Sequence, residues 1–206
     1  MHIPDGFLNV PTLIVTQTVA IGCIGVSAKK IQSSLDVRRI PLLGLGAAFL
    51  FCLQLFSVPV PGGTSVHVSG VVLLAVLLGP HSVIVIGACS LALQALLFQH
   101  GGILSFGANF LTITLLPAWI GSWIYGKLNA SSRIVALSTA ILVGKILGAA
   151  LCASILAVSS MVPFEVGLPA MVLANGLGAI LESVICVGLL SFILTHRPVI
   201  LEGTRQ

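Results

Sequence analysis

Seven apolar runs, nearly free of charged residues, make up most of this sequence. A helix that spans a bilayer needs about 20 mostly apolar residues. We therefore predict an all-α, polytopic integral membrane protein with seven transmembrane helices, the third of them short and ending at Gly79-Pro80. No linker, low-complexity tract or repeat divides the chain, so residues 1–206 form a single membrane domain. The predicted spans cover about 11–28, 40–58, 67–78, 81–98, 109–126, 134–158 and 169–195.

The composition excludes several other classes of protein. Only 7% of the 206 residues are charged and 57% are hydrophobic, whereas a soluble domain carries about 25% charged residues. A soluble enzyme, a disordered chain and a coiled coil are all excluded. The five cysteines lie singly in apolar segments without CxxC spacing, so we interpret them as small buried hydrophobes. The net charge of +4 comes from short basic clusters between apolar runs, which argues against nucleic-acid binding.

Those basic clusters predict the orientation of the chain. With seven spans, the first connection, the connection after the fifth span and the C-terminal tail share one side of the membrane. Since basic residues mark the cytoplasmic side, we expect a cytoplasmic C-terminus and an extracytoplasmic N-terminus in the cell membrane. The basic residues that set this orientation are Lys29, Lys30, Arg38, Arg39, Lys127, Arg133, Arg197 and Arg205.

The first two residues offer an unusual set of metal donors. No basic region precedes the first apolar run, which argues against a signal peptide, and the bulky His2 disfavours removal of Met1. A free α-amine, the His2 amide nitrogen and the His2 Nδ1 can form two fused chelate rings in one plane. An all-nitrogen tetragonal site suits Ni(II) or Cu(II). His67 is the best candidate for the fourth donor, and His100 is the second.

Simpler interpretations of these residues stand beside the metal site. An N-terminal Met-His pair can occur by accident, His67 can lie at the membrane interface, and His100 can be a loop residue. A Ser65–His67 pair could instead serve a membrane hydrolase, but no carboxylate that would orient the base stands near it in the sequence.

Two charged residues fall inside predicted spans. Lys145 lies in the sixth span and Glu182 near the middle of the seventh. Ionisable residues are costly in a membrane and are usually paired. Adjacent antiparallel helices can bring these two to similar depth, so we predict a structural Lys145–Glu182 ion pair rather than a proton relay.

Several motifs closely resemble one known family, the CbiM/NikM substrate-binding (S) components of energy-coupling-factor (ECF) nickel and cobalt transporters. The opening MHIPDGFL resembles the amino-terminal motif of that family. Further matching stretches are PGGTSVH with Gly70, LGP at 78–80, and QALLF at 94–98 continuing through Gly101-Gly102 to Gly107-Ala108-Asn109. The resemblance covers essentially the whole chain and implies an S-component bundle with an inserted N-terminal segment.

The resemblance also implies a ligand set. In the family, a square-planar nitrogen site is formed by the Met1 amine, the His2 amide and imidazole, and the His67 imidazole. Asp5, Ser65, His100 and Asn109 are candidates for alternative ligands or for residues that orient the ligands. The Pro4-Asp5 pair resembles nickel members, so Ni(II) is the expected substrate and Co(II), feeding cobalamin synthesis, the alternative.

The resemblance further implies a transport subunit that is not itself an enzyme. The sequence has no GxxxxGK[ST] phosphate loop, and family members use two cytoplasmic ATPases and a transmembrane coupling protein. The chain lacks the extra C-terminal membrane segment of some nickel members, which implies a separate small membrane subunit. An S component for an organic vitamin is a further alternative, but it predicts an aromatic-lined pocket and only 6% of residues are aromatic.

Overall fold

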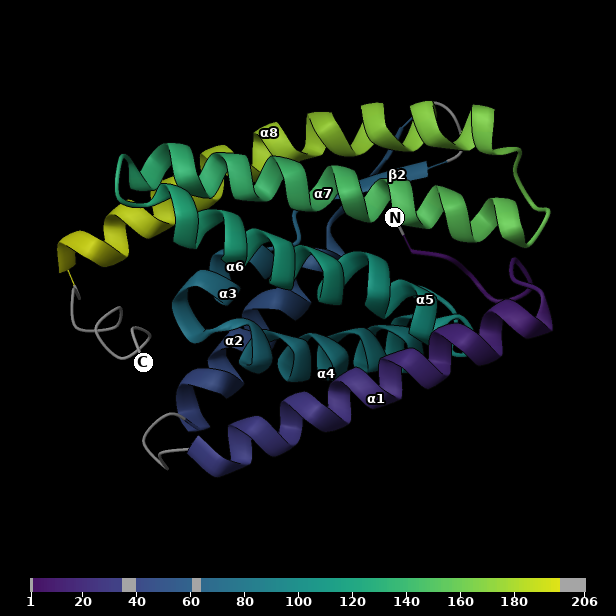
Figure 1. Ribbon diagram of the computed structural model, residues 1–206, viewed down its shortest axis with the longest axis horizontal. Coiled ribbons are helices and arrows are strands. Elements are labelled where there is room, and N and C mark those ends of the chain that lie inside the picture. The colour runs from purple at the N-terminus through teal and green to yellow at the C-terminus, as the bar shows by residue number, and fades with distance from the viewer. Residues whose placement is uncertain (1, 35–39, 61–63, 197–206) are drawn as a thin grey trace.

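The computed structural model describes residues 2–34, 40–60 and 64–196 as a nearly all-helical bundle (Figure 1). The chain runs through α1 (Val10–Ser34), α2 (Ile40–Leu55), α3 (Val71–Leu78), α4 (Pro80–Phe98), α7 (Arg133–Val158) and α8 (Phe164–His196). Between α4 and α7, α5 (Phe106–Phe110), a π-helical turn η2 (Leu111–Leu115) and α6 (Leu116–Leu128) follow one another directly. The helical content agrees with the predicted fold class.

A two-stranded hairpin is the exception to the all-α prediction. Strands β1 (Ser57–Val60) and β2 (Thr64–His67) pair antiparallel, with Ser57 opposite His67. The prediction of a helix beginning at His67 is therefore wrong. Gly70 has a φ of 69°, and α3 begins only after this left-handed residue. The predicted break at Gly79-Pro80 is confirmed, because Gly79 has a φ of 84° and Pro80 opens α4, where its missing N–H costs nothing.

The number of membrane crossings remains a prediction. Helical segments lie at all seven predicted positions, but among the described residues only α1, α4, α7 and α8 are long and apolar enough to cross a bilayer alone. Helix α2 is apolar but shorter, α3 has eight residues, and the fifth predicted span is divided by η2. Large apolar side chains are exposed along α1 and α8, as expected for helices that face lipid.

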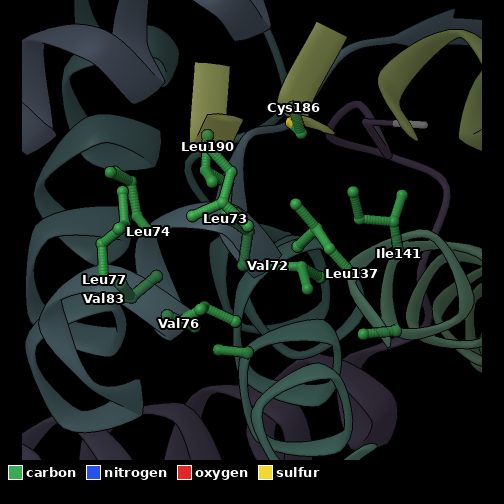
Figure 2. Close-up of a cluster of buried hydrophobic side chains, with 14 of the residues drawn as sticks. Val72, Leu73, Leu74, Val76, Leu77, Val83, Leu137, Ile141, Cys186 and Leu190 are labelled. Carbon is green, nitrogen blue, oxygen red and sulfur yellow. The ribbon is translucent and has the colours of Figure 1, made fainter. Parts of the chain in front are cut away.

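The short helix α3 lies in the centre of the bundle. Its residues Val71 to Leu77 are all buried and pack against Leu50 of α2, Val83 of α4, Leu137 of α7 and Leu190 of α8. Figure 2 shows side chains of α3, such as Leu73, next to Leu137 and Leu190 from other helices. Because α3 is covered by its neighbours, the segment that leads into it, residues 67–70, is also placed in the interior.

The connections between helices lie at two opposite ends of the bundle. In Figure 1 the start of α1, the α4–α5 loop and the α7–α8 connection lie at one end, and the α6–α7 connection lies at the other. The segment before α1 turns back from the first end into the bundle, toward β2 (Figure 1). Ile3 and Leu8 are buried in a second apolar cluster with Ile84 and Phe110, which holds this segment inside.

Candidate metal centre

Three imidazoles meet where the N-terminal segment enters the bundle. The ring centroid of His2 lies 4.9 Å from that of His67 in β2, and the two planes are tilted by 35°. On another side, the His2 ring makes an edge contact with His100, with 4.2 Å between centroids. The structure thus brings together three histidines from the N-terminal segment, the hairpin and the loop after α4.

Several polar atoms at this place are buried without a hydrogen-bond partner among the described residues. They are Nδ1 and Nε2 of His2, Nε2 of His100 and Oε1 of Gln94. The Gln94 side chain is close enough to influence the pKa of His2. Buried polar groups are nearly always satisfied in native proteins. Orphaned nitrogens with available lone pairs therefore fit a site that takes a positively charged ligand.

The side chain of Asn109 holds the N-terminal segment next to its histidine. The backbone N–H of Ile3 donates to Asn109 Oδ1 at 2.7 Å, and Asn109 Nδ2 donates to the carbonyl of Ile3 at 2.9 Å. The same carbonyl accepts from the Ser105 hydroxyl at 2.6 Å and from the Gly102 N–H at 3.0 Å. Asn109 therefore orients the segment that carries His2.

Asp5 is a second anchor of the same segment. Its carboxylate accepts from the backbone N–H of Ile103 and from that of Ser105, each at 3.0 Å. Both carboxylate oxygens are thereby engaged in binding the loop after α4. In this arrangement Asp5 ties the segment to the loop.

Two glycines let the segment and the loop approach each other. A Cβ on Gly102 would collide with Asp5, and Gly101 has a φ of 90°, a conformation that favours glycine. A Cβ on Gly101 would also lie 3.4 Å from the His2 ring. The Gly101-Gly102 pair therefore makes room for the inserted segment.

His67 is held in place by a charged side chain of α7. It is 5% exposed, and its backbone carbonyl accepts from Lys145 Nζ at 2.7 Å. Lys145 is also 2.7 Å from Glu182 Oε2, so the structure places the two intramembrane charges together. Ser65 lies in β2 opposite Pro59 in the backbone pairing. Met1 lies outside the described residues.

Burial makes the imidazoles poor bases. It is the largest cause that lowers the pKa of His2 and of His67 well below the usual value of 6.5, and the charge of Lys145 adds to the effect at His67. Burial also lowers the pKa of His100. These histidines are therefore neutral at pH 7, the form in which an imidazole binds a metal.

Among the described residues, side chains alone do not form a complete metal site. No group of three His, Cys, Asp or Glu residues there has an arrangement that could hold a metal ion. Two imidazoles would need further donors, such as backbone nitrogens. Gln54, Gln94 and Ser105 were not predicted as site residues. Gln94 begins the matching QALLF stretch, and the signal for the other two was a polar residue within or beside an apolar run.

Comparison with known proteins gives consistent matches. Residues 2–200 match the family model described as "Cobalt uptake substrate-specific transmembrane region". The "Fused nickel transport protein NikMN" of Rhodobacter capsulatus is 30% identical over 225 residues, which cover 100% of this chain and 65% of that protein. The "Cobalt transport protein CbiM" of Listeria seeligeri is 34% identical over 139 residues, covering 65% of this chain and 57% of that protein. The chain thus spans less than two thirds of the length of either relative.

A solved structure shares the fold. The crystal structure of a truncated transition metal transporter superposes with a TM-score of 0.89 at 31% sequence identity. The match covers 95% of this chain and 99% of the other chain. The overall arrangement of the helices is therefore one that a related protein also adopts.

Proposed function

Because the chain belongs to the family of cobalt uptake substrate-specific transmembrane regions, we propose that it is the substrate-binding S component of an ECF importer for Ni(II). It binds the ion at the extracytoplasmic face and takes part in its delivery across the membrane. It is a transport subunit without catalytic activity of its own.

One observation carries this proposal, the meeting of the His2 and His67 rings beside buried nitrogens that lack partners. The Met1 amine is joined to the His2 amide nitrogen through two carbon atoms, so a metal bound by both closes a five-membered ring. His2 Nδ1 extends the chelate in the same plane, and His67 supplies the fourth nitrogen. Such an all-nitrogen tetragonal set suits Ni(II).

Nickel is favoured over cobalt as the substrate. Four nitrogen donors in a plane, one of them a deprotonated amide, stabilise the planar form of Ni(II), and the Rhodobacter capsulatus relative is named a nickel transport protein. The alternative is a cobalt-specific S component that supplies cobalamin synthesis. It is supported by the name of the Listeria seeligeri relative and by the description of the family model.

The proposal includes partner subunits in the cell membrane. The sequence carries no phosphate-binding loop of the GxxxxGK[ST] type, so ATP is hydrolysed by two cytoplasmic ATPases that act through a transmembrane coupling protein. A separate small membrane subunit completes the assembly. The S component has its N-terminus outside and its C-terminus in the cytoplasm, as the basic clusters predict.

A metal titration with two N-terminal forms tests the proposal. Detergent-purified protein that starts at Met1 is compared with protein extended by two residues before Met1. The extension converts the amine to an amide and leaves every side chain in place. We expect about one Ni(II) per chain for the native start and none for the extended form. His67→Gln is expected to weaken Ni(II) binding. His196→Gln is the matched control and should bind normally, because His196 is exposed and its ring contacts the Phe192 carbonyl.

Three outcomes would contradict parts of this proposal. Equal binding by the native and extended forms would mean that side chains elsewhere hold the metal, and His100 would become the first alternative ligand. Binding of Co(II) in strong preference to Ni(II) would favour the cobalt alternative. If the native protein bound neither ion, the chain would not be a nickel or cobalt carrier.

A further inference from the structure

The buried ion pair between α7 and α8 needs an explanation beyond stability. Lys145 Nζ lies 2.7 Å from Glu182 Oε2, and the side chains are 8% and 0% exposed. Burying two charges costs several kcal/mol of desolvation per ion, and apolar residues of similar volume often stabilise a protein equally well. The role of the pair is therefore inferred from its contacts with other parts of the chain.

Both members of the pair also bind the segment that carries His67. Lys145 Nζ donates to the carbonyl of His67 at 2.7 Å. Glu182 Oε1 accepts from the Ser69 hydroxyl at 2.7 Å and from the Gly70 N–H at 2.9 Å, and its Oε2 accepts from the Ser69 N–H at 3.0 Å. Residues 67–70 are thereby clamped by four hydrogen bonds to two charged side chains from different helices.

The segment is also held by the hairpin that precedes it, which pairs four residues of each strand and packs Val66 against Gly178 of α8. A two-stranded hairpin is marginally stable alone, so these contacts act together with the clamp. After His67 the chain leaves the strand and passes through the left-handed Gly70 before α3 begins. Charge-assisted hydrogen bonds are about twice as strong as neutral ones, so the bond from Lys145 is a strong restraint on the His67 carbonyl.

A chain of buried amides extends the clamp toward His2. Gln54 Nε2 donates to the Ser69 carbonyl at 3.2 Å, and Gln94 Nε2 donates to Gln54 Oε1 at 3.0 Å. Gln94 Nε2 also donates to the Ser90 hydroxyl at 3.0 Å, which uses both of its protons. Gln94 Oε1 is left without a hydrogen-bond partner among the described residues, and the Gln94 side chain is close enough to His2 to influence its pKa.

We propose that Lys145 and Glu182 are positioning residues for metal binding, which fix the backbone of His67 so that its imidazole faces His2. The inference rests on the proposed function of this site. Because the two charges cancel, the pair can bind the backbone of residues 67–70 through charge-assisted hydrogen bonds without a net charge that would repel the metal cation. Neither side chain contacts the metal.

A purely structural role is the competing explanation, and the two make different predictions. If the pair only joins α7 to α8, replacing both residues by apolar ones restores both stability and metal binding. If the pair positions His67, the double replacement restores only the stability lost to an unpaired charge, and it leaves the segment 67–70 without its clamp. Stability and metal affinity then separate in the same variant.

The test compares Lys145→Met, Glu182→Met and the double variant in detergent. Thermal unfolding is measured together with Ni(II) affinity and the ligand-field absorption of bound Ni(II). We expect each single variant to unfold at a lower temperature. The double variant should regain the part of this loss that comes from an unpaired buried charge, but not the part that comes from the lost hydrogen bonds to residues 67–70. The double variant should still bind Ni(II) at least about 10-fold more weakly, with a shifted absorption band, since residues that orient ligands typically contribute 10- to 100-fold.

Leu190→Ala is the matched control for lost stability. Leu190 lies on α8 and is 2% exposed in the central apolar cluster (Figure 2). The substitution should lower the unfolding temperature and leave Ni(II) affinity and absorption unchanged. Ser69→Ala gives a second variant if the double one does not fold, because it removes one hydrogen bond to Glu182 and keeps the ion pair. It should weaken binding roughly threefold to tenfold.

Native affinity and absorption in the double variant would overturn the inference and leave the proposed function intact. Unchanged affinity in Ser69→Ala would do the same if the double variant cannot be purified. A native protein that binds neither Ni(II) nor Co(II) would instead overturn the proposed function, and the inference with it. A double variant that is stable but binds weakly, beside a normal Leu190→Ala control, supports the positioning role.

Discussion

Replacing Asn109 with Ala removes the side chain that holds the N-terminal segment at the metal centre. Ile3 N–H then loses the acceptor that binds it at 2.7 Å, and its carbonyl loses one donor but keeps those from Ser105 and Gly102. An unsatisfied buried N–H costs about 1–3 kcal/mol, and one lost hydrogen bond costs about 1 kcal/mol more. Docking of the segment should therefore weaken by about 2 kcal/mol.

This loss converts to a measurable change in metal affinity. A site that exists only when the segment is docked has an apparent affinity scaled by the docked fraction. About 2 kcal/mol corresponds to roughly 30-fold, so we expect Ni(II) to bind up to about 30-fold more weakly to Asn109→Ala. The thermal unfolding of the bundle should change little, because the segment precedes α1 and is not one of its helices.

The assay is a Ni(II) titration of detergent-purified protein by calorimetry. Asn175→Ala is the control, since Asn175 is also buried but bonds only within α8, to the carbonyl of Met171 at 2.9 Å. Unchanged affinity in Asn109→Ala would refute the idea that docking of this segment builds the site. An equal loss in Asn175→Ala would show that the effect comes from the bundle as a whole.

Three further predictions concern the histidine side of the centre and the bound ion. Gly178→Ala should weaken Ni(II) binding, because its Cβ collides with Val66 in β2, whereas Gly176→Ala meets open space and should bind normally in the same titration. The unfolding temperature of metal-free protein should be constant above about pH 6.5 and fall below it. Burial lowers the pKa of His2 and His67, so as the pH falls the unfolded chain takes up protons before the folded chain does, which favours unfolding. The double variant His2→Gln/His67→Gln should flatten this fall. Ni(II) at 100 times its Kd should stabilise the native protein by about 2.7 kcal/mol, and a chelator should reverse the shift.

The helices could be predicted because apolar runs and glycine–proline breaks are local signals. The break at Gly79-Pro80 appears in the structure where the sequence places it. The hairpin could not be predicted in the same way. Its strands contain Pro59 and flank the PGG stretch at 61–63, and proline within a run argues against a strand. Pairing of β2 with β1 and its contact with α8 outweigh that local preference.

For the candidate site, too, features set by neighbouring residues in the sequence could be predicted, and contacts between distant residues could not. The donor chemistry of the Met1-His2 pair is local. His67 was predicted as its partner from the residues, and the resemblance implies the same residue. The residues that hold these donors in place are not local: Ile3 bonds to Asn109, which is 106 positions away, and Ser69 bonds to Glu182 at a separation of 113. Polar residues in apolar runs, such as Gln54 and Gln94, indicated buried hydrogen bonding in general but not which partners they would find.

The two histidine-bearing segments are anchored by different physical means, and this asymmetry bears on how the site can open. The segment with His2 is attached at the end of the bundle by neutral hydrogen bonds and by Asp5, which is exposed and therefore open to competition from water. The segment with His67 is attached in the interior by a buried ion pair that water does not reach. Local opening begins where solvent competes for the restraints, so undocking of the N-terminal segment costs less than displacement of His67. Removing His2 would take away both nitrogens that this residue contributes to the proposed chelate, so the more easily released segment is also the one that controls whether the metal is held.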